Sequence, residues 1–250
     1  MSRRLGRWVL GAAAIVFGCV GYAYLTLPDV RVLATENPTS TAFTELRARE
    51  ARADGKTPKH VQTWIAYRRI SPALTRAVLV AEDAAFWQHD GVDYDELQKS
   101  VEVDWARGQL TRGASTITQQ LAKNLYLSPS KNPLRKFREL IIARRLEAEL
   151  SKQRIFELYL NVIEWGDGIY GADAAAQAYF HKSAAALGRS EAALMAGAII
   201  NPRVMNPLKP TRRLNRRQQI ILGRMGEVTP PVARASADDL AEDERRDEQK

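Results

Sequence analysis

The sequence is poor in cysteine and histidine, and this scarcity excludes several kinds of site. The only cysteine among 250 residues, Cys19, cannot form an intrachain disulfide or a thiolate metal cluster. The three histidines, His60, His89 and His181, do not have the spacing of zinc ligands. Acidic residues are also fewer than basic ones, 29 against 37. The net charge of +8 indicates an anionic partner, which could be nucleic acid, an anionic membrane surface or a phosphorylated substrate.

Charged residues are absent from Trp8–Leu27, a run of twenty residues near the N-terminus. As a helix this run is ~30 Å long, which matches the hydrocarbon core of a bilayer. Arg3, Arg4 and Arg7 precede it, so we expect a cytoplasmic N-terminus and export of everything that follows. No small-residue cleavage site follows it, which favours an uncleaved single-pass anchor over a cleaved signal peptide. In an exported protein, nucleic acid is a poor candidate for the anionic partner.

Large apolar residues are nearly absent from the end of the chain. Ala235–Lys250 carries seven acidic and three basic side chains, and we expect it to be disordered because it cannot bury enough surface to offset its ordering entropy. The sequence therefore divides as follows: 1–7, a basic cytoplasmic N-terminus; 8–27, a transmembrane anchor; 28–60, a juxtamembrane connector; 61–226, one folded domain; 227–250, an acidic tail.

Within the folded part, hydrophobic spacing of three to four residues predicts a mainly α fold. Ser71-Pro72 begins one helix with a cap residue followed by proline, and its buried face includes Leu74 and Val78. Ser190 is expected to cap a nearly all-apolar helix at the centre of the domain. The other helices are expected at Phe43–Arg52, Tyr94–Gln109, Leu134–Leu150, Gln153–Asn161, Asp173–Phe180 and Leu214–Met225, the central one at Glu191–Ile200, and the one strand at Thr63–Arg69.

The first candidate site is the segment Glu82–Gly91, where two adjacent acids end an apolar helix. Partial burial raises the pKa of a carboxyl group and suits it to general acid–base catalysis. Because neighbouring residues on a helix point in different directions, only one of Glu82 and Asp83 can face a given cleft. A helix end facing solvent explains the same pattern.

The second candidate, Arg112–Asn124, begins a helix at Thr116, where Gln119 three residues later completes a capping-box pattern. Thr116, Gln120 and Lys123 share one face of this helix. Its free N–H groups, hydroxyl, amide and ammonium could hold phosphate or sugar oxygens. A capped surface helix is the alternative. The third candidate, Lys131–Glu139, is a dense group of cations that is either a solvated face or a site for phosphate or anionic lipid.

These segments together resemble the peptidoglycan glycosyltransferase family, and the resemblance covers roughly Tyr67 to Pro207. Its motifs occur in the family's order: Glu82-Asp-x-x-Phe86-x-x-His89-x-Gly91, Gly113-Ala-Ser-Thr-Ile-Thr-Gln-Gln120, Arg135-Lys-x-x-Glu139, Lys152-x-x-Ile155-x-Glu157-x-Tyr159-Leu160-Asn161 and Ala192-Ala-Leu-Met-Ala-Gly197. With no transpeptidase domain following, the monofunctional members of the family are the nearer match. The resemblance implies a lysozyme-like, two-lobed, mainly α domain at the periplasmic face of a bacterial inner membrane.

The resemblance also implies the chemistry. The substrate would be lipid II, polymerised into glycan strands with inversion at the anomeric carbon and release of undecaprenyl pyrophosphate. Glu82 matches the catalytic base and Glu139 the second essential carboxylate. The remaining matched positions are expected to bind or position substrate: Asp83, Phe86, His89, Ser115, Thr116, Gln119, Gln120, Lys123, Lys131 and Arg135.

No protein metal ligand is expected, although a magnesium or manganese ion could accompany the donor pyrophosphate. The expected partners are lipid II, the nascent glycan strand, the inner membrane and other cell-wall synthesis and division proteins, with no nucleic acid. Two departures from the family pattern stand out. Ala114 replaces a common glycine, and Lys131 replaces a common arginine, which keeps the charge but loses the bidentate fork.

Two other functions remain open. A membrane-anchored lytic transglycosylase or muramidase would share the fold but would not need the cations at Lys123 and Lys131. A catalytically silent scaffold for cell-wall synthesis would leave the pair Glu82 and Glu139 unexplained.

Overall fold

The structure is a computed structural model that describes residues 26–98, 115–127 and 133–228, together with isolated positions nearer the N-terminus. Most of the predicted anchor, Trp8–Leu27, and nearly all of the acidic tail lie outside the described residues, so both stay predictions. Among the described residues, no helix has the length and apolar character needed to cross a membrane. The predicted helix Tyr94–Gln109 begins at Tyr94, and its continuation beyond residue 98 lies outside the described part.

The described residues are mainly helical, as predicted, and most helix ends follow local sequence signals. The helix α3 (Pro72–Glu82) begins at Ser71, whose hydroxyl accepts from the backbone N–H of Ala73. The helix α5 (Ile117–Tyr126) begins at Thr116 in the same way. The other helices are η1 (Arg31–Ala34), α2 (Ala42–Ala53), η2 (Tyr67–Arg69), α6 (Pro133–Glu149), α7 (Lys152–Val162), α8 (Ala172–Phe180), η3 (Ala184–Ala186), α9 (Arg189–Ala198) and α10 (Arg212–Arg224).

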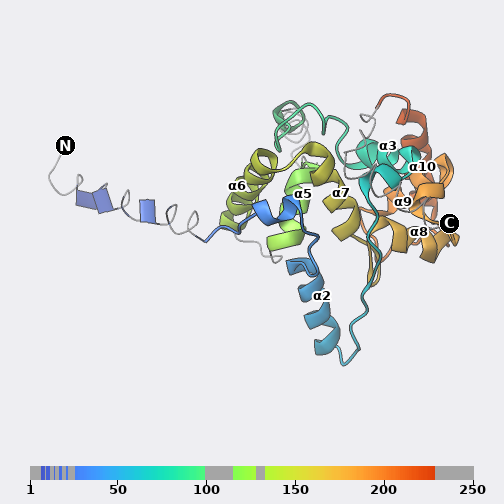
Figure 1. Cartoon of the computed structure of the whole chain (residues 1–250), viewed down its shortest axis with the longest axis horizontal. Helices are drawn as coiled ribbons and strands as arrows, with labels where there is room; N and C mark the ends of the chain where they lie inside the picture. Colours follow the sequence, from blue (N-terminus) through green and yellow to red (C-terminus); the bar gives the residue numbers. More distant parts are fainter. Residues whose placement is uncertain are drawn as a thin grey trace, which may run out of the picture.

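The helices form two groups that meet at α7 (Figure 1). In one group, α5 packs against α6 and α7. In the other, α9 lies at the centre and packs against α3 and α10. The helix α9 is buried from Ala192 to Ala198, as its apolar sequence predicted, while its first turn is more exposed. Both groups share one hydrophobic core, to which Val30 and Leu33 from the segment before α2 also belong.

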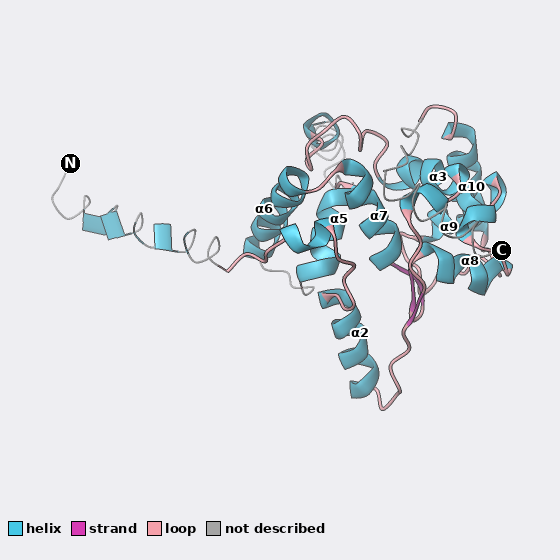
Figure 2. Ribbon diagram, in the orientation of Figure 1, coloured by secondary structure: helices cyan, strands magenta, loops and turns pink. Residues whose placement is uncertain are grey.

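A small sheet lies beside α8, and it corrects the strand prediction (Figure 2). Its strands are β1 (Val61–Gln62), β2 (Glu164–Gly166) and β3 (Ile169–Tyr170), with β3 in the middle, parallel to β1 and antiparallel to β2. The predicted strand Thr63–Arg69 is wrong, because helix α7 takes the hydrogen bonds that a neighbouring strand would make. The Asn161 side chain bonds both the N–H and the carbonyl of Ile65, at 2.9 Å each, and Glu157 accepts from the N–H of Tyr67.

The predicted cap of α9 is also wrong. The helix begins at Arg189 with Gly188 as its cap, two residues earlier than expected, because the Glu191 carboxylate reaches back to accept from the Gly188 N–H at 3.0 Å. Ser190 therefore lies inside the first turn, and its hydroxyl accepts from the side-chain amide of Gln218 on α10. Because glycine has no side-chain oxygen, only this half of a capping box is present, and it holds the helix start without a hydroxyl.

Candidate active site

Glu82 is the last residue of α3 and points toward α5. Its Oε2 accepts a hydrogen bond from Nε2 of Gln120 at 3.0 Å. Burial raises the pKa of Glu82, while the Gln120 hydrogen bond and the charges of Arg217 and Lys123 oppose the rise. A carboxylate with a raised pKa binds a proton more readily than an ordinary glutamate, so the position has the chemistry expected of a general base.

Asp83 points away from Glu82, as expected for adjacent residues at a helix end. It is buried, and its carboxylate accepts from the N–H of Ile117 at 2.9 Å and from Nε2 of His89 at 3.0 Å. The other ring nitrogen of His89 accepts from the N–H of Gly91 at 3.2 Å, which leaves Nε2 as the donor to Asp83. Asp83 thus joins the end of α3 to the beginning of α5 and holds the loop between His89 and Gly91 in place.

Gly91 provides a second connection between this loop and α5. Its carbonyl accepts from Oγ1 of Thr116 at 2.7 Å and from Nε2 of Gln119 at 3.1 Å. Its φ of +82° favours glycine, and an added Cβ would lie 3.1 Å from Cγ of Glu147.

The capping-box prediction for the start of α5 is half right. Thr116 accepts from the Gln119 N–H, but the Gln119 amide turns to Gly91 and to the Lys136 ammonium instead of returning to Thr116.

Phe86 needs a correction, because it was expected among the substrate-binding positions. Its side chain is fully buried, with its ring 5.4 Å from that of Phe156 and the Lys152 ammonium 4.4 Å from its centroid. An apolar ring at this place in the sequence fills the core beneath the loop. Phe86 therefore supports the site from within the core.

Glu139 on α6 is enclosed by cations. Only 3% of this residue is exposed, and its carboxylate accepts from Nη1 of Arg135 at 2.9 Å and from Nζ of Lys136. The Lys136 ammonium also reaches Oε1 of Gln119 at 2.9 Å and Oγ of Ser115 at 3.4 Å. Lys136 therefore connects α6 to the start of α5. It was not among the predicted site residues, although its spacing of three from Glu139 places both on one helix face.

Lys123 lies on the exposed side of α5, within electrostatic reach of both predicted carboxylates. Desolvation lowers the pKa of Lys123, the attraction of Glu139 opposes this, and repulsion from Arg135 adds to it. The charge of Glu82 also acts on it. Lys131, the other cation expected here, lies outside the described residues, so its role stays a prediction.

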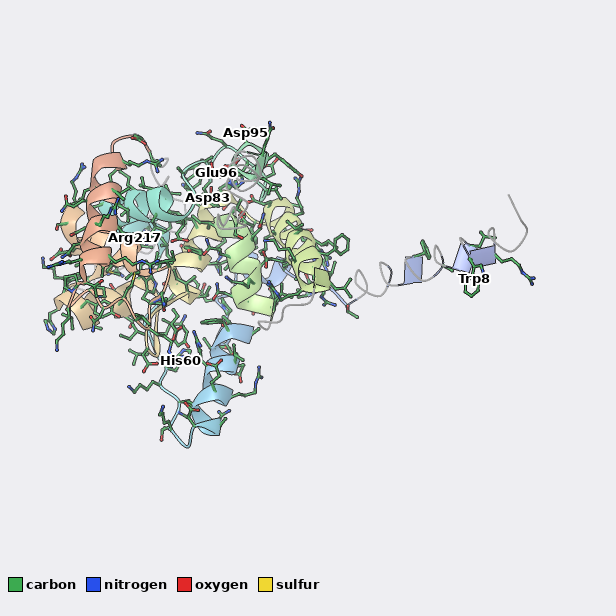
Figure 3. All side chains as sticks on the ribbon, turned by 180° about the vertical axis from the view of Figure 1, so that it is seen from behind. Trp8, His60, Asp83, Asp95, Glu96 and Arg217 are labelled. Carbon is green, nitrogen blue, oxygen red and sulfur yellow. The ribbon has the colours of Figure 1, made fainter. Side chains whose placement is uncertain are left out.

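A cavity of about 560 Å³ opens beside Glu82 and Asp83. It extends to acidic residues beyond Asp83, and Figure 3 shows Asp95 and Glu96 on the same side of the molecule as Asp83. The cavity is lined by Val80, Ala81, Glu82, Asp83, Ala84, Ala85, Gln88, Asp93, Asp95, Glu96, Ser115, Thr116 and Arg224. The site therefore has an open, polar space in which a hydroxyl-bearing substrate can approach the Glu82 carboxylate.

The comparisons with known proteins agree with this geometry. Residues 23–226 match a family model described as Transglycosylase. The chain belongs to the transglycosylase family. It is 42% identical over 231 residues to the biosynthetic peptidoglycan transglycosylase of Dechloromonas aromatica (strain RCB), covering 91% of this chain and 99% of that protein.

The proteins of the same name from Thiobacillus denitrificans and Aromatoleum aromaticum are 44% and 49% identical. The first match covers 92% of this chain and 99% of its relative, the second 67% and 73%. Every predicted site residue of this transglycosylase lies inside the family match.

The residues of this transglycosylase give little support to a resident metal ion. Around Glu139, the donors that face the carboxylate are the cations Arg135 and Lys136, which compete with a metal for the same oxygens. Elsewhere in the described part, ligand atoms of Asp83, His89 and Asp93 lie within 4.8 Å of one another. Asp83 already accepts hydrogen bonds from His89 and Ile117, so this group is satisfied without an ion.

Proposed function

We propose that this transglycosylase is a peptidoglycan glycosyltransferase that polymerises lipid II into glycan strands. The observation that carries the proposal is the pairing of two features on α5. Gln120 holds Glu82, a carboxylate with a raised pKa, beside an open cavity, while Lys123 and Lys136 bring positive charge to the same helix. A base next to preplaced cations suits a reaction in which a hydroxyl attacks and a phosphate leaves.

In the proposed reaction, Glu82 takes the proton from the 4-hydroxyl of the acceptor sugar. The oxygen then attacks the anomeric carbon of the growing chain, a new glycosidic bond forms, and the bond to undecaprenyl pyrophosphate breaks with inversion. The leaving pyrophosphate carries away the electron pair as negative charge. The raised pKa of Glu82 helps because proton transfer is most efficient when the base is matched to the working pH.

The cations have two roles in this proposal. Arg135, Lys136 and Lys123 stabilise the charge that develops on the pyrophosphate, and such stabilisation is strongest when the charges are in place beforehand. Glu139 keeps Arg135 and Lys136 in position, since its carboxylate accepts from both. A magnesium or manganese ion, if it takes part, would arrive with the pyrophosphate.

The cellular setting forms part of the same proposal. The uncharged run Trp8–Leu27 would anchor the chain in the bacterial inner membrane, with the catalytic domain in the periplasm and near other cell-wall synthesis proteins. Two lobes on either side of a cleft, as in lysozyme, would correspond to the two groups of helices that meet at α7.

A lytic transglycosylase or muramidase is the main alternative, because it also needs a carboxyl group in a cleft. Such an enzyme cleaves existing glycan and releases no phosphate, so it does not explain why Lys136 and Arg135 converge on α5 and Glu139. A silent scaffold does not explain the half-buried Glu82 with its fixed hydrogen bond. The arrangement therefore favours synthesis.

Product analysis separates these functions. Full-length protein in detergent is incubated with labelled lipid II, and in parallel with purified glycan strands. We expect lipid II to yield a ladder of glycan polymers with stoichiometric release of undecaprenyl pyrophosphate and the inverted anomeric linkage. Shortening of the glycan strands instead would support the lytic alternative. If neither polymer nor shortened glycan forms, the scaffold is supported.

A further inference from the structure

The Glu82 hydrogen bond continues inward to a buried tyrosine on α7. The hydroxyl of Tyr159 donates to Oε1 of Gln120 at 3.1 Å, and Nε2 of the same amide donates to Oε2 of Glu82 at 3.0 Å. Tyr159 is fully buried, so its ring is held by the core and its hydroxyl has one fixed direction. Three residues from α7, α5 and α3 thus form one continuous chain of hydrogen bonds.

The chemistry of the three side chains decides which group donates and which accepts in each of these hydrogen bonds. An ionised carboxylate only accepts hydrogen bonds, so the Gln120 amide must present its NH₂ group to Glu82 and its carbonyl to Tyr159. The reverse orientation would place the amide oxygen against the carboxylate oxygen. Burial raises the pKa of Tyr159 well above its ordinary value, with the charges of Glu82 and Asp83 adding to the effect. Its hydroxyl therefore keeps its proton and remains a donor.

We propose that Tyr159 is a positioning residue for the glycosyltransferase reaction, which fixes the Gln120 amide so that the amide holds the Glu82 carboxylate beside the cavity. The inference rests on the proposed function and extends it to a residue that does not touch substrate. It also changes the part assigned to Gln120, because its side-chain oxygen accepts from Tyr159 and its side-chain nitrogen donates to Glu82, whereas the notion of a phosphate ligand needs neither contact.

The chain of hydrogen bonds has a measurable consequence for acid–base behaviour. The Gln120 hydrogen bond lowers the pKa of Glu82 against the larger effect of burial. If Tyr159 no longer fixes the amide, this stabilisation of the ionised carboxylate weakens, and Glu82 becomes protonated at higher pH. The rate should then fall on the acidic side of the pH profile.

Other buried tyrosines provide matched controls. The hydroxyl of Tyr179 donates to the Trp165 carbonyl at 3.0 Å, away from the cavity. The hydroxyl of Tyr170 has no hydrogen-bond partner among the described residues. Removing these hydroxyls makes the same chemical change in the same kind of surroundings, but it leaves Gln120 and Glu82 untouched.

The test compares Tyr159→Phe, Tyr179→Phe and wild type, all full length, in lipid II polymerisation across pH. For Tyr159→Phe we expect kcat to fall roughly three- to tenfold at neutral pH, as for the loss of one hydrogen bond, with KM little changed. The acidic limb of its kcat/KM profile should move to higher pH. The profile of Tyr179→Phe should match that of wild type. An unshifted profile for Tyr159→Phe, or an equal shift in Tyr179→Phe, would overturn the inference.

A second comparison asks whether Tyr159 acts through Gln120. Gln120→Met removes both amide hydrogen bonds at a less buried position, so it gives a readout even if Tyr159→Phe folds poorly, and it should shift the acidic limb in the same direction. Adding Tyr159→Phe to Gln120→Met should then change nothing further, because the two residues lie in one pathway. Independent, additive effects would overturn the inference. Absence of polymer from wild type would instead overturn the proposed function itself.

Discussion

Replacing Asp83 by asparagine changes one oxygen to an amide nitrogen at the junction of α3 and α5. The carboxylate accepts from the N–H of Ile117 and from Nε2 of His89, and both partners can only donate there. Asparagine keeps one accepting oxygen and places its NH₂ group against the other donor. One of the two hydrogen bonds is therefore lost, and the remaining one is no longer charge-assisted.

The size of the effect follows from these contacts. A hydrogen bond to a charged group contributes about 1.5–3 kcal/mol, and a buried donor left unsatisfied costs a similar amount. Because Asp83 is buried, we expect Asp83→Asn to lower the free energy of unfolding by about 2–3 kcal/mol. For a domain of this size, the melting temperature should fall by about 4–12 °C.

Asp173→Asn is the matched control. Asp173 also accepts from one backbone N–H, that of Ala184, and from one side chain, that of Ser183, at 2.8 Å each, but it lies outside the cavity beside Glu82. Both variants should lose stability in thermal unfolding, whereas only Asp83→Asn should also lose polymerisation rate at temperatures where it remains folded. If Asp83→Asn keeps both its melting temperature and its rate, the assignment of Asp83 as the connection between α3 and α5 is wrong.

Three further predictions concern charge. Because the pKa of Glu82 is raised in the folded state, the contribution of this one group to stability is largest at low pH and is lost as pH rises through its folded pKa. Glu82→Gln should therefore melt at or above the wild-type temperature near pH 8, and a clear loss there would contradict the burial argument. Lys136→Ala should lower kcat/KM for lipid II roughly tenfold or more, because it removes a charged partner of Glu139. Lys182→Ala, the control, breaks an exposed ion pair with Glu191 and should leave kcat/KM unchanged. Equal effects of the two substitutions would refute the role of Lys136. Adding EDTA should lower the polymerisation rate only modestly, and complete loss restored by magnesium would show that a metal is essential.

Short-range signals in the sequence predicted most of the fold. Ser71 and Thr116 each begin a helix where predicted, because a side-chain oxygen close to the helix start satisfies backbone N–H groups locally. The segment Thr63–Arg69 was mispredicted because its partners, Asn161 and Glu157, lie 96 and 90 residues further along the chain. Local propensity cannot indicate which distant side chain will take a backbone hydrogen bond.

The candidate site also combines features that local sequence predicts with features that depend on distant residues. The adjacent acids Glu82 and Asp83 were predicted to diverge, and this follows from helix geometry alone. The contribution of Tyr159 could not be seen, because its hydroxyl meets Gln120 only once α5 and α7 pack together. Phe86 lies in a functional motif and was expected to bind or position substrate. Its ring lies in the core, which the motif alone did not indicate.

The identity of the base is tested most directly by the initial rate of lipid II polymerisation for wild type, Glu82→Gln and Glu191→Gln at the same pH. Glu191 lies in the first turn of α9 and outside the cavity, so its variant controls for the chemical change alone. With Glu82 as the general base, Glu82→Gln should lose roughly 10²–10⁴-fold in rate while remaining folded, and Glu191→Gln should match wild type. A folded Glu82→Gln that polymerises lipid II within tenfold of the wild-type rate would contradict the account.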